Sequence, residues 1–269
     1  MGWKGVWMAM VFVIFSYIGT EVVAVTAGEA KDPQRAVPNA MRSMVGRLIA
    51  FYVGAIAVLL GIVPWNQIQP GSDVTASPFV KVFQLMHIPS APHVVNFVII
   101  TAALSSINCN LYLVTRMIFS LARGGYAPQS FGRVSVRGTP INALLISTAG
   151  LALAIVIALV YPSSAYVYLF GISLFGGLFV WLMIFVTHLF FRSKWEAEGR
   201  PRLPVRMIGY PYTTVLGGLL IVGILLTTWW VEGMQICLFT GLLWMAFISA
   251  VYWFFFKTKR KAASTASAS

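Results

Sequence analysis

The chain has 269 residues, of which 59% are hydrophobic and only 10% are charged. This composition excludes a soluble globular domain, which would need far more charged surface. The formal net charge of +12 does not indicate a nucleic-acid partner, because the Lys and Arg residues lie between apolar runs rather than on a soluble, aromatic-bearing surface. We therefore predict an all-α, polytopic membrane protein with the lipid bilayer as its surroundings.

Seven stretches are long and apolar enough to cross the hydrocarbon layer, which is roughly 30 Å thick, as helices. Together they predict a transmembrane domain over residues 1–257, followed by a disordered tail over residues 258–269 that lacks the apolar mass to fold. The predicted spans cover residues 5–28, 43–64, 93–121, 140–161, 165–190, 212–231 and 234–256.

Basic residues fall almost wholly on alternate connections between these spans, beginning with the connection after the first span. Because cytoplasmic loops carry the excess of Lys and Arg, this pattern predicts an N-terminus outside and a C-terminus in the cytoplasm of a plasma or inner membrane. A secretory signal peptide over the first span is the alternative. It would place the basic segment after Gly28 outside, against the charge pattern of the later loops.

The external connection over residues 65–92 is long and contains several prolines, and its apolar residues between Phe79 and Leu85 predict a short helix of its own. In the fifth span, Gly176 and Gly177 predict the close approach of another helix. Cys109 and Cys237 lie in separate spans without metal or redox spacing, so we expect them to be packing residues. No cofactor or metal is expected.

The first span contains polar and small residues at mid-depth, where a helix that only crosses lipid would carry none. Gly19 lets the backbone leave helical geometry at low cost, and the Ser16 and Thr20 hydroxyls suit freed backbone groups. We therefore predict a helix broken near residues 16–20, with carbonyls placed for an ammonium group and amides for an anion. The motif reads Phe15-Ser16-Tyr17-Ile18-Gly19-Thr20-Glu21.

Phe15 and Tyr17 flank this break and could cover a bound ligand. Glu21, a carboxylate in an apolar span, is a functional candidate because acidic groups within a membrane are rare and usually functional. The alternative is that Gly19 is a packing notch and Glu21 a buried structural group bonded to a neighbour.

The motif and several later segments resemble the bacterial amino acid permeases of the amino acid, polyamine and organocation superfamily. Their pattern is an aromatic-Ser-aromatic-x-Gly-x-Glu break followed by a loop with a Glu and two prolines. The resemblance covers residues 12–140. Its further segments are Gly28–Pro38, Pro64-Trp65-Asn66, Ser77-Pro78-Phe79-Val80, Ala102–Asn108 and Ser120–Pro128.

The resemblance implies a LeuT-type fold of twelve helices, in which two five-helix inverted repeats precede two peripheral helices. The break matches the sixth helix, so the chain would carry helices six to twelve: the second repeat and the peripheral pair. It implies secondary, proton-coupled transport of an amino acid. Because the substrate of such a fold lies between two broken helices, we expect the chain not to transport without an N-terminal half.

By this resemblance, Phe15 matches a gating aromatic, and the backbone over residues 15–18 supplies carbonyls to the substrate's amino group. Glu21 matches a carboxylate that serves proton coupling or supports the break. Ser105 and Ser106 match a helix that forms a cation site in sodium-coupled relatives. The alternative for both serines is that their hydroxyls bond the preceding helical turn.

Two other classes of function remain open from the sequence. Seven spans with an external N-terminus also describe heptahelical receptors and retinal proteins, although residues 234–256 contain no lysine for a retinal Schiff base. A non-transporting membrane subunit that assembles with a separate first half is the other. An enzyme is not expected, because the sequence shows no phosphate-binding loop, activated nucleophile or metal-ligand cluster.

Overall fold

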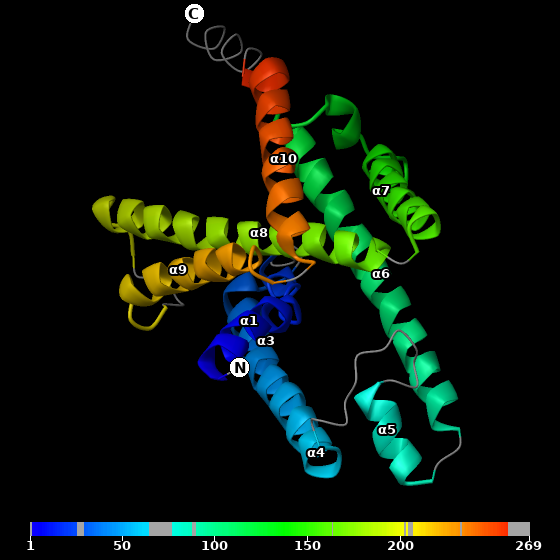
Figure 1. Ribbon diagram of the computed structural model, residues 1–269. Coiled ribbons are helices and arrows are strands. Elements are labelled where there is room, and N and C mark those ends of the chain that lie inside the picture. The colour runs from blue at the N-terminus through cyan, green and yellow to red at the C-terminus, as the bar shows by residue number, and fades with distance from the viewer. Residues whose placement is uncertain are drawn as a thin grey trace, which may run out of the picture. The chain divides into compact units, whose positions relative to one another are not determined.

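The computed structural model describes residues 2–25, 30–64, 77–87, 90–162, 164–201, 203, 207–231 and 233–257 (Figure 1). Within these ranges every regular element is a helix, which confirms the predicted all-α class. The chain divides into two compact units. We call Met1–Thr20 with Thr115–Ser269 the α8 unit, and Glu21–Val114 the α3 unit.

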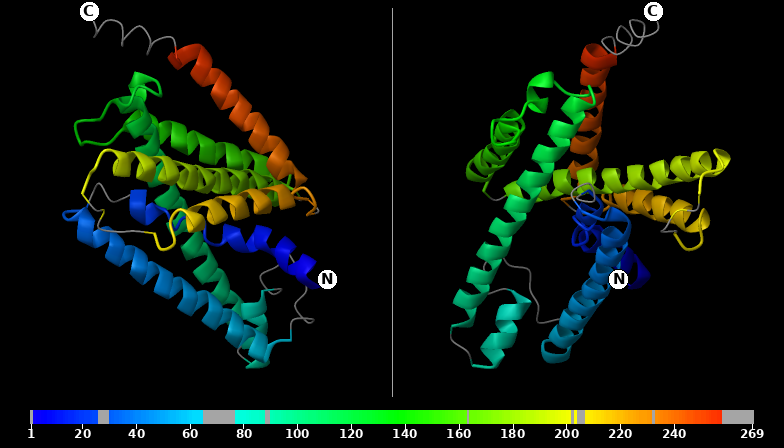
Figure 2. Two further views of the ribbon diagram at one scale, coloured as in Figure 1. Left: turned by 90° about the vertical axis from the view of Figure 1, so that its left-hand side faces the viewer. Right: turned by 180° about the vertical axis from the view of Figure 1, so that it is seen from behind.

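The α3 unit begins with the short helix α2 (Val22–Val25) and continues with α3 (Pro33–Leu48), the π-helix η2 (Ile49–Val53) and α4 (Gly54–Ile62). These last three elements form one continuous rod (Figure 2). Pro33 suits the first helical turn, where its missing N–H has no intrahelical partner to lose. The helix therefore begins before residue 43, where the predicted span starts.

The rod ends where a proline follows. Val63 leaves helical geometry with φ −115° and ψ 115°, because Pro64 disfavours the α conformation in the residue before it. Within the long connection that follows, α5 (Pro78–Leu85) is a separate short helix. The helix α6 (Ala91–Arg123) then runs from the α3 unit into the α8 unit, which it enters at Thr115.

The α8 unit is built around one long helix, α8 (Ala165–Ala197). It contacts both α9 (Tyr212–Thr227) and α10 (Gln235–Val251), of which α9 lies alongside it in Figure 1. The remaining elements are α1 (Gly2–Phe15), the 3-10 helix η5 (Gln129–Gly132), α7 (Ile141–Val160) and the π-helix η6 (Tyr252–Lys257). Its core comprises Val11, Phe170, Leu174, Phe175, Leu178, Ile221, Ile224, Val231, Met234 and Cys237.

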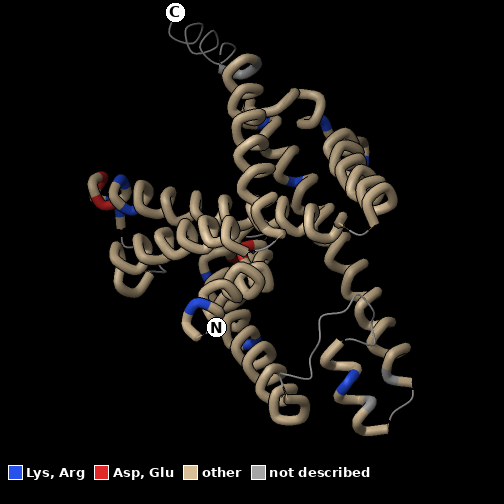
Figure 3. Tube along the Cα trace, viewed as in Figure 1, with Lys and Arg blue, Asp and Glu red and all other residues tan. Residues whose placement is uncertain are grey.

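Five described helical segments are long and apolar enough to cross a membrane, and α1 and α9 are shorter apolar helices. Their outward side chains are strongly exposed: Phe51 by 72%, Phe97 by 69% and Leu159 by 75%. Figure 3 shows long runs of helix without Lys, Arg, Asp or Glu. Such apolar surface is stable against lipid or other helices but not against water, so the chain is a multi-pass membrane protein with the seven apolar segments predicted.

The charged side chains of α8 all lie near its C-terminal end. Arg192 Nη2 lies 2.7 Å from Glu196 Oε1, and Arg200 Nη2 lies 2.6 Å from Glu198 Oε2. Trp195 Nε1 donates to the Pro201 carbonyl at 2.9 Å, which ties the following turn back to the helix. This cluster of paired charges, in which Glu196, Glu198 and Arg200 are exposed, marks a helix end that lies in water or headgroups rather than in hydrocarbon.

One side-chain hydrogen bond joins α1 to α9. Trp7 Nε1 donates to Thr227 Oγ1 at 2.7 Å, and the same hydroxyl donates to the Gly223 carbonyl at 2.7 Å. Thr227 is only 6% exposed. Because an indole N–H in apolar surroundings needs a partner, this bond fixes how α1 lies on α9.

We expect Thr227→Val to lower the free energy of unfolding by about 1–2 kcal/mol, because valine keeps the shape but leaves the Trp7 N–H without its acceptor. The midpoint of thermal unfolding in detergent should fall by about 2–4 °C. Thr148→Val is the matched control, since the Thr148 hydroxyl donates to Leu144 of its own helix. Equal losses in the two variants would contradict the role of the Trp7 bond.

Candidate functional site

The predicted break is present in the first apolar segment. Helix α1 ends at Phe15, residues 16–21 are turns, and α2 begins at Val22. The backbone N–H groups of Ser16, Tyr17 and Ile18 each donate to the carbonyl three residues earlier, at 3.0–3.1 Å. The helix therefore tightens from α-type to 3-10-type bonding before it stops, as helix ends commonly do.

Gly19 makes the change of direction, with φ +105°. Residues with a Cβ atom rarely adopt this conformation, whereas glycine adopts it readily. Among the described residues, a Cβ built on Gly19 would meet no atom within 4 Å, so within this part of the chain the backbone conformation, and not crowding, calls for glycine.

Carbonyl groups gather in this break. The Phe15 carbonyl accepts the Ile18 N–H at 3.1 Å, and the Tyr17 carbonyl accepts the Thr20 N–H at 3.2 Å. A carbonyl oxygen has two lone pairs, so a carbonyl that accepts one N–H can also accept a second donor. The arrangement can chemically bind an ammonium group.

Phe15 belongs to an aromatic cluster in the α8 unit. Its ring centroid lies 4.3 Å from that of Phe170, and Phe170 also contacts Phe12 at 5.9 Å and Tyr166 at 5.7 Å. Phe170 is 8% exposed and lies in the core. Its role in holding Phe15 was missed in the sequence, where one phenylalanine among 19 carries no distinguishing signal.

Ile18 lies against α8, where Gly177 faces it. The sequence predicted a close approach at this pair of glycines, but the approaching segment is the break itself rather than the side of another helix.

Glu21 belongs to the α3 unit, whereas residues 15–20 belong to the α8 unit. Its backbone carbonyl accepts the N–H groups of Ala24 at 2.9 Å and Val25 at 3.2 Å, so Glu21 immediately precedes α2 and starts its hydrogen bonding. Glu29, Trp65 and Asn66, which contribute to the resemblance, lie outside the described residues.

Ser105 and Ser106 lie on the part of α6 that belongs to the α3 unit, and both are exposed. Asn110 Nδ2 donates to the Ser106 carbonyl at 2.9 Å and also to the Ser106 hydroxyl oxygen at 3.4 Å. A cation site at these serines stays a prediction. Among the described residues, no group of three His, Cys, Asp or Glu side chains could hold a metal ion.

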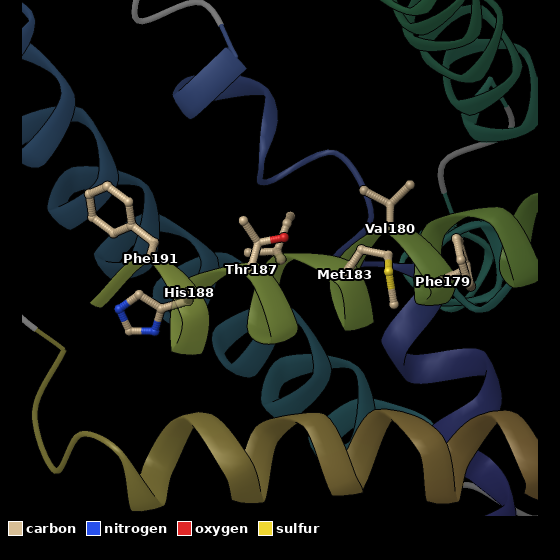
Figure 4. A pocket seen from close by; sticks show the side chains of 7 residues that line it. Phe179, Val180, Met183, Thr187, His188 and Phe191 are labelled. Atoms are coloured by element: carbon tan, nitrogen blue, oxygen red, sulfur yellow. The ribbon is translucent and has the colours of Figure 1, made fainter. Parts of the chain in front are cut away.

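A groove of about 460 Å³ runs along α8 (Figure 4). Its walls are apolar apart from Thr187 and His188, and His188 Nδ1 lies 3.1 Å from Thr214 Oγ1 on α9. The lining contains none of the predicted site residues, so this groove is separate from the break. It is lined by Phe179, Val180, Met183, Ile184, Thr187, His188 and Phe191.

Comparison with known proteins decides the family. The family model described as amino acid permease matches residues 2–264. The chain belongs to the amino acid permease family. This confirms the resemblance seen in the sequence.

Several curated permeases are similar to the chain. The probable threonine/serine transporter YbxG of Bacillus subtilis (strain 168) is 33% identical over 98% of the chain and 56% of its own length. The gamma-aminobutyric acid permease of the same organism is 36% identical over 87% of the chain and 49% of its own length. The aromatic amino acid transport protein AroP of Salmonella typhimurium (strain SL1344) is 32% identical over 99% of the chain and 56% of its own length.

The chain thus spans about half the length of the curated permeases it matches. No solved structure gives a significant match to it.

We expect Gly19→Ala to cost about 1–2 kcal/mol of unfolding free energy, because alanine must adopt a conformation that its Cβ disfavours. SDS-induced unfolding followed by circular dichroism would measure the loss. Gly61→Ala in α4 is the control, since Gly61 lies within a helix and also has open space around its Cβ position. There alanine should be neutral or stabilising, by about 0.5–1 kcal/mol. A neutral Gly19→Ala would show that the bend is not fixed by glycine.

Proposed function

We propose that the chain forms part of a secondary active amino acid transporter and that the break binds the backbone groups of the substrate. The observation that carries this proposal is Gly19 at φ +105° within the first apolar segment. A chain that leaves helical geometry inside a membrane exposes backbone groups at a cost, and such breaks are used by transporters to coordinate substrates. Membership of the amino acid permease family supports the same interpretation.

The substrate's ammonium group is the part that this chain is best suited to bind. The Phe15 carbonyl at the end of α1 accepts the Ile18 N–H at 3.1 Å, and a carbonyl oxygen can accept a second donor such as an ammonium group. The side chains of Phe15 and Tyr17 would cover the bound molecule, and Ser16 and Gly19 complete the backbone surface. Because these contacts recognise groups common to all amino acids, substrate choice must come from other side chains.

Glu21 is the proposed proton-coupling group. It follows Gly19 by two residues and immediately precedes α2, so its side chain would take up or release a proton beside the break. The charge pattern supports an external N-terminus and a cytoplasmic C-terminus in a plasma or inner membrane.

The second part of the proposal concerns the rest of the permease. The relatives are about twice as long as the chain, and a transporter built of repeats binds its substrate between them. We propose that the other walls of the site come from a preceding half, so that the chain does not transport alone.

Uptake measurements in liposomes test this directly. The chain alone should give no uptake of radiolabelled threonine, histidine, phenylalanine or gamma-aminobutyric acid above empty vesicles. A chimera that adds the part of the gamma-aminobutyric acid permease outside the matched region should give saturable uptake of at least one of them. An inactive chimera whose parent permease is active would favour a non-transporting subunit. Saturable uptake by the chain alone would contradict the need for a second half.

Coupling is tested in the same chimera with Glu21→Gln, which removes the titratable group but keeps its size. We expect an inward proton gradient to stop stimulating uptake, while substrate exchange without a gradient continues at a comparable rate. Glu196→Gln is the control, because Glu196 is paired with Arg192 at the end of α8. If Glu21→Gln retains the full response to the gradient, Glu21 is not the coupling group.

A further inference from the structure

The broken segment lies along one face of α8. Phe170 and Gly177 are seven residues apart on this helix, which places them on the same side, about 10 Å from each other. Phe170 contacts Phe15 at the end of α1, and Gly177 faces Ile18 within the break. The segment is therefore held at two points, one aromatic and one at a glycine.

The contact at Gly177 leaves no room for a side chain. A Cβ built there would overlap Ile18 Cδ1, and it would lie 3.0 Å from Cγ1 and 3.3 Å from Cγ2. Rotation about the outer bond of Ile18 moves only Cδ1, and the branched Cβ restricts rotation about the inner bond. An added methyl group would therefore force the Ile18 tip to turn away and would also press on Cγ1 and Cγ2, which lie nearer to the backbone of the break.

The α8 side of this contact is the rigid side. Leu174 and Leu178, on either side of Gly177, are fully buried, and the Phe175 ring fills the space beside Gly241 of α10. In the break, by contrast, Ser16 and Gly19 are exposed. A clash at Gly177 is therefore relieved on the side of the break, through Ile18, because moving α8 would disturb a packed core.

The neighbouring glycine provides an internal comparison. A Cβ on Gly176 would meet nothing within 4 Å, although it occupies the same helix one residue earlier. Of these two neighbouring glycines, Gly177 alone is crowded by the described residues around it.

We infer that Gly177 is a positioning residue: its missing side chain seats Ile18 and thereby fixes where the carbonyls of the break lie. It contacts no substrate. The consequence for substrate affinity rests on the proposed function, whereas the seating itself does not.

The seating is tested on the full chain in detergent with a cysteine reporter. Thr20→Cys places a thiol of similar size in the half-buried end of the break, and Cys109→Ser removes the exposed native thiol. Buried Cys237 is kept, because its reaction with N-ethylmaleimide reports loss of the whole fold. Mass spectrometry then follows the two thiols separately.

Gly177→Ala should raise the rate of modification at position 20 by about fivefold, while Cys237 stays unreactive. Ile18→Val removes Cδ1, the atom nearest to the new methyl group, and should return the rate in Gly177→Ala to within about twofold of the original. Gly176→Ala should leave the rate unchanged. Equal rates in the two alanine variants, or no restoration by Ile18→Val, would overturn the inference.

The consequence for transport is tested in the chimera. Gly177→Ala should raise the KM for uptake by about fivefold with little change in maximal rate, and Ile18→Val should reverse the change. An unchanged KM alongside a faster thiol reaction would overturn the positioning role and leave a packing contact. A wild-type chimera without uptake would contradict the proposed function instead, and the thiol rates would still decide whether Gly177 seats the break.

Discussion

The α8 unit depends on the packing of α1 and the break that follows it against α8. The hydrophobic effect does not hold helices together within lipid, so close contact and a few interior hydrogen bonds must do so. Here the contacts are the aromatic cluster around Phe170, the bond from Trp7 to Thr227, and Ile18 against Gly177. The backbone can leave helical geometry at Gly19 because the residues before it are held in this way.

The sequence predicts the features of this fold that depend on neighbouring residues. A glycine beside polar groups in an apolar span predicts the break, since each such residue is costly in lipid unless it has a purpose. The end of the α3–α4 rod likewise follows from Pro64. Periodicity gave no sign of the π-helical turns over residues 49–53, because they contain only apolar and aromatic side chains that suit an α-helix equally well.

The partners of the break could not be predicted from the sequence. Phe170 and Gly177 are more than 150 residues from Phe15 and Ile18, and nothing local distinguishes Gly177 from Gly176. The difference arises from the rotation of α8 about its axis, which is set by Leu174, Phe175 and Leu178 in the core. Residue types therefore identified where a site could be, whereas tertiary packing determines which side chains support it.

The length of α8 has a consequence for its surroundings. Its apolar part runs from Ala165 to Phe191, about 40 Å of helix, whereas the hydrocarbon layer is about 30 Å thick. A helix with such an excess tilts, kinks or locally thickens the bilayer, so that its ends reach the headgroups. A thinner bilayer demands more tilt and a thicker one less. Because Phe15 and Ile18 rest on Phe170 and Gly177, the end of α1 and the start of the break follow α8 whenever its tilt changes.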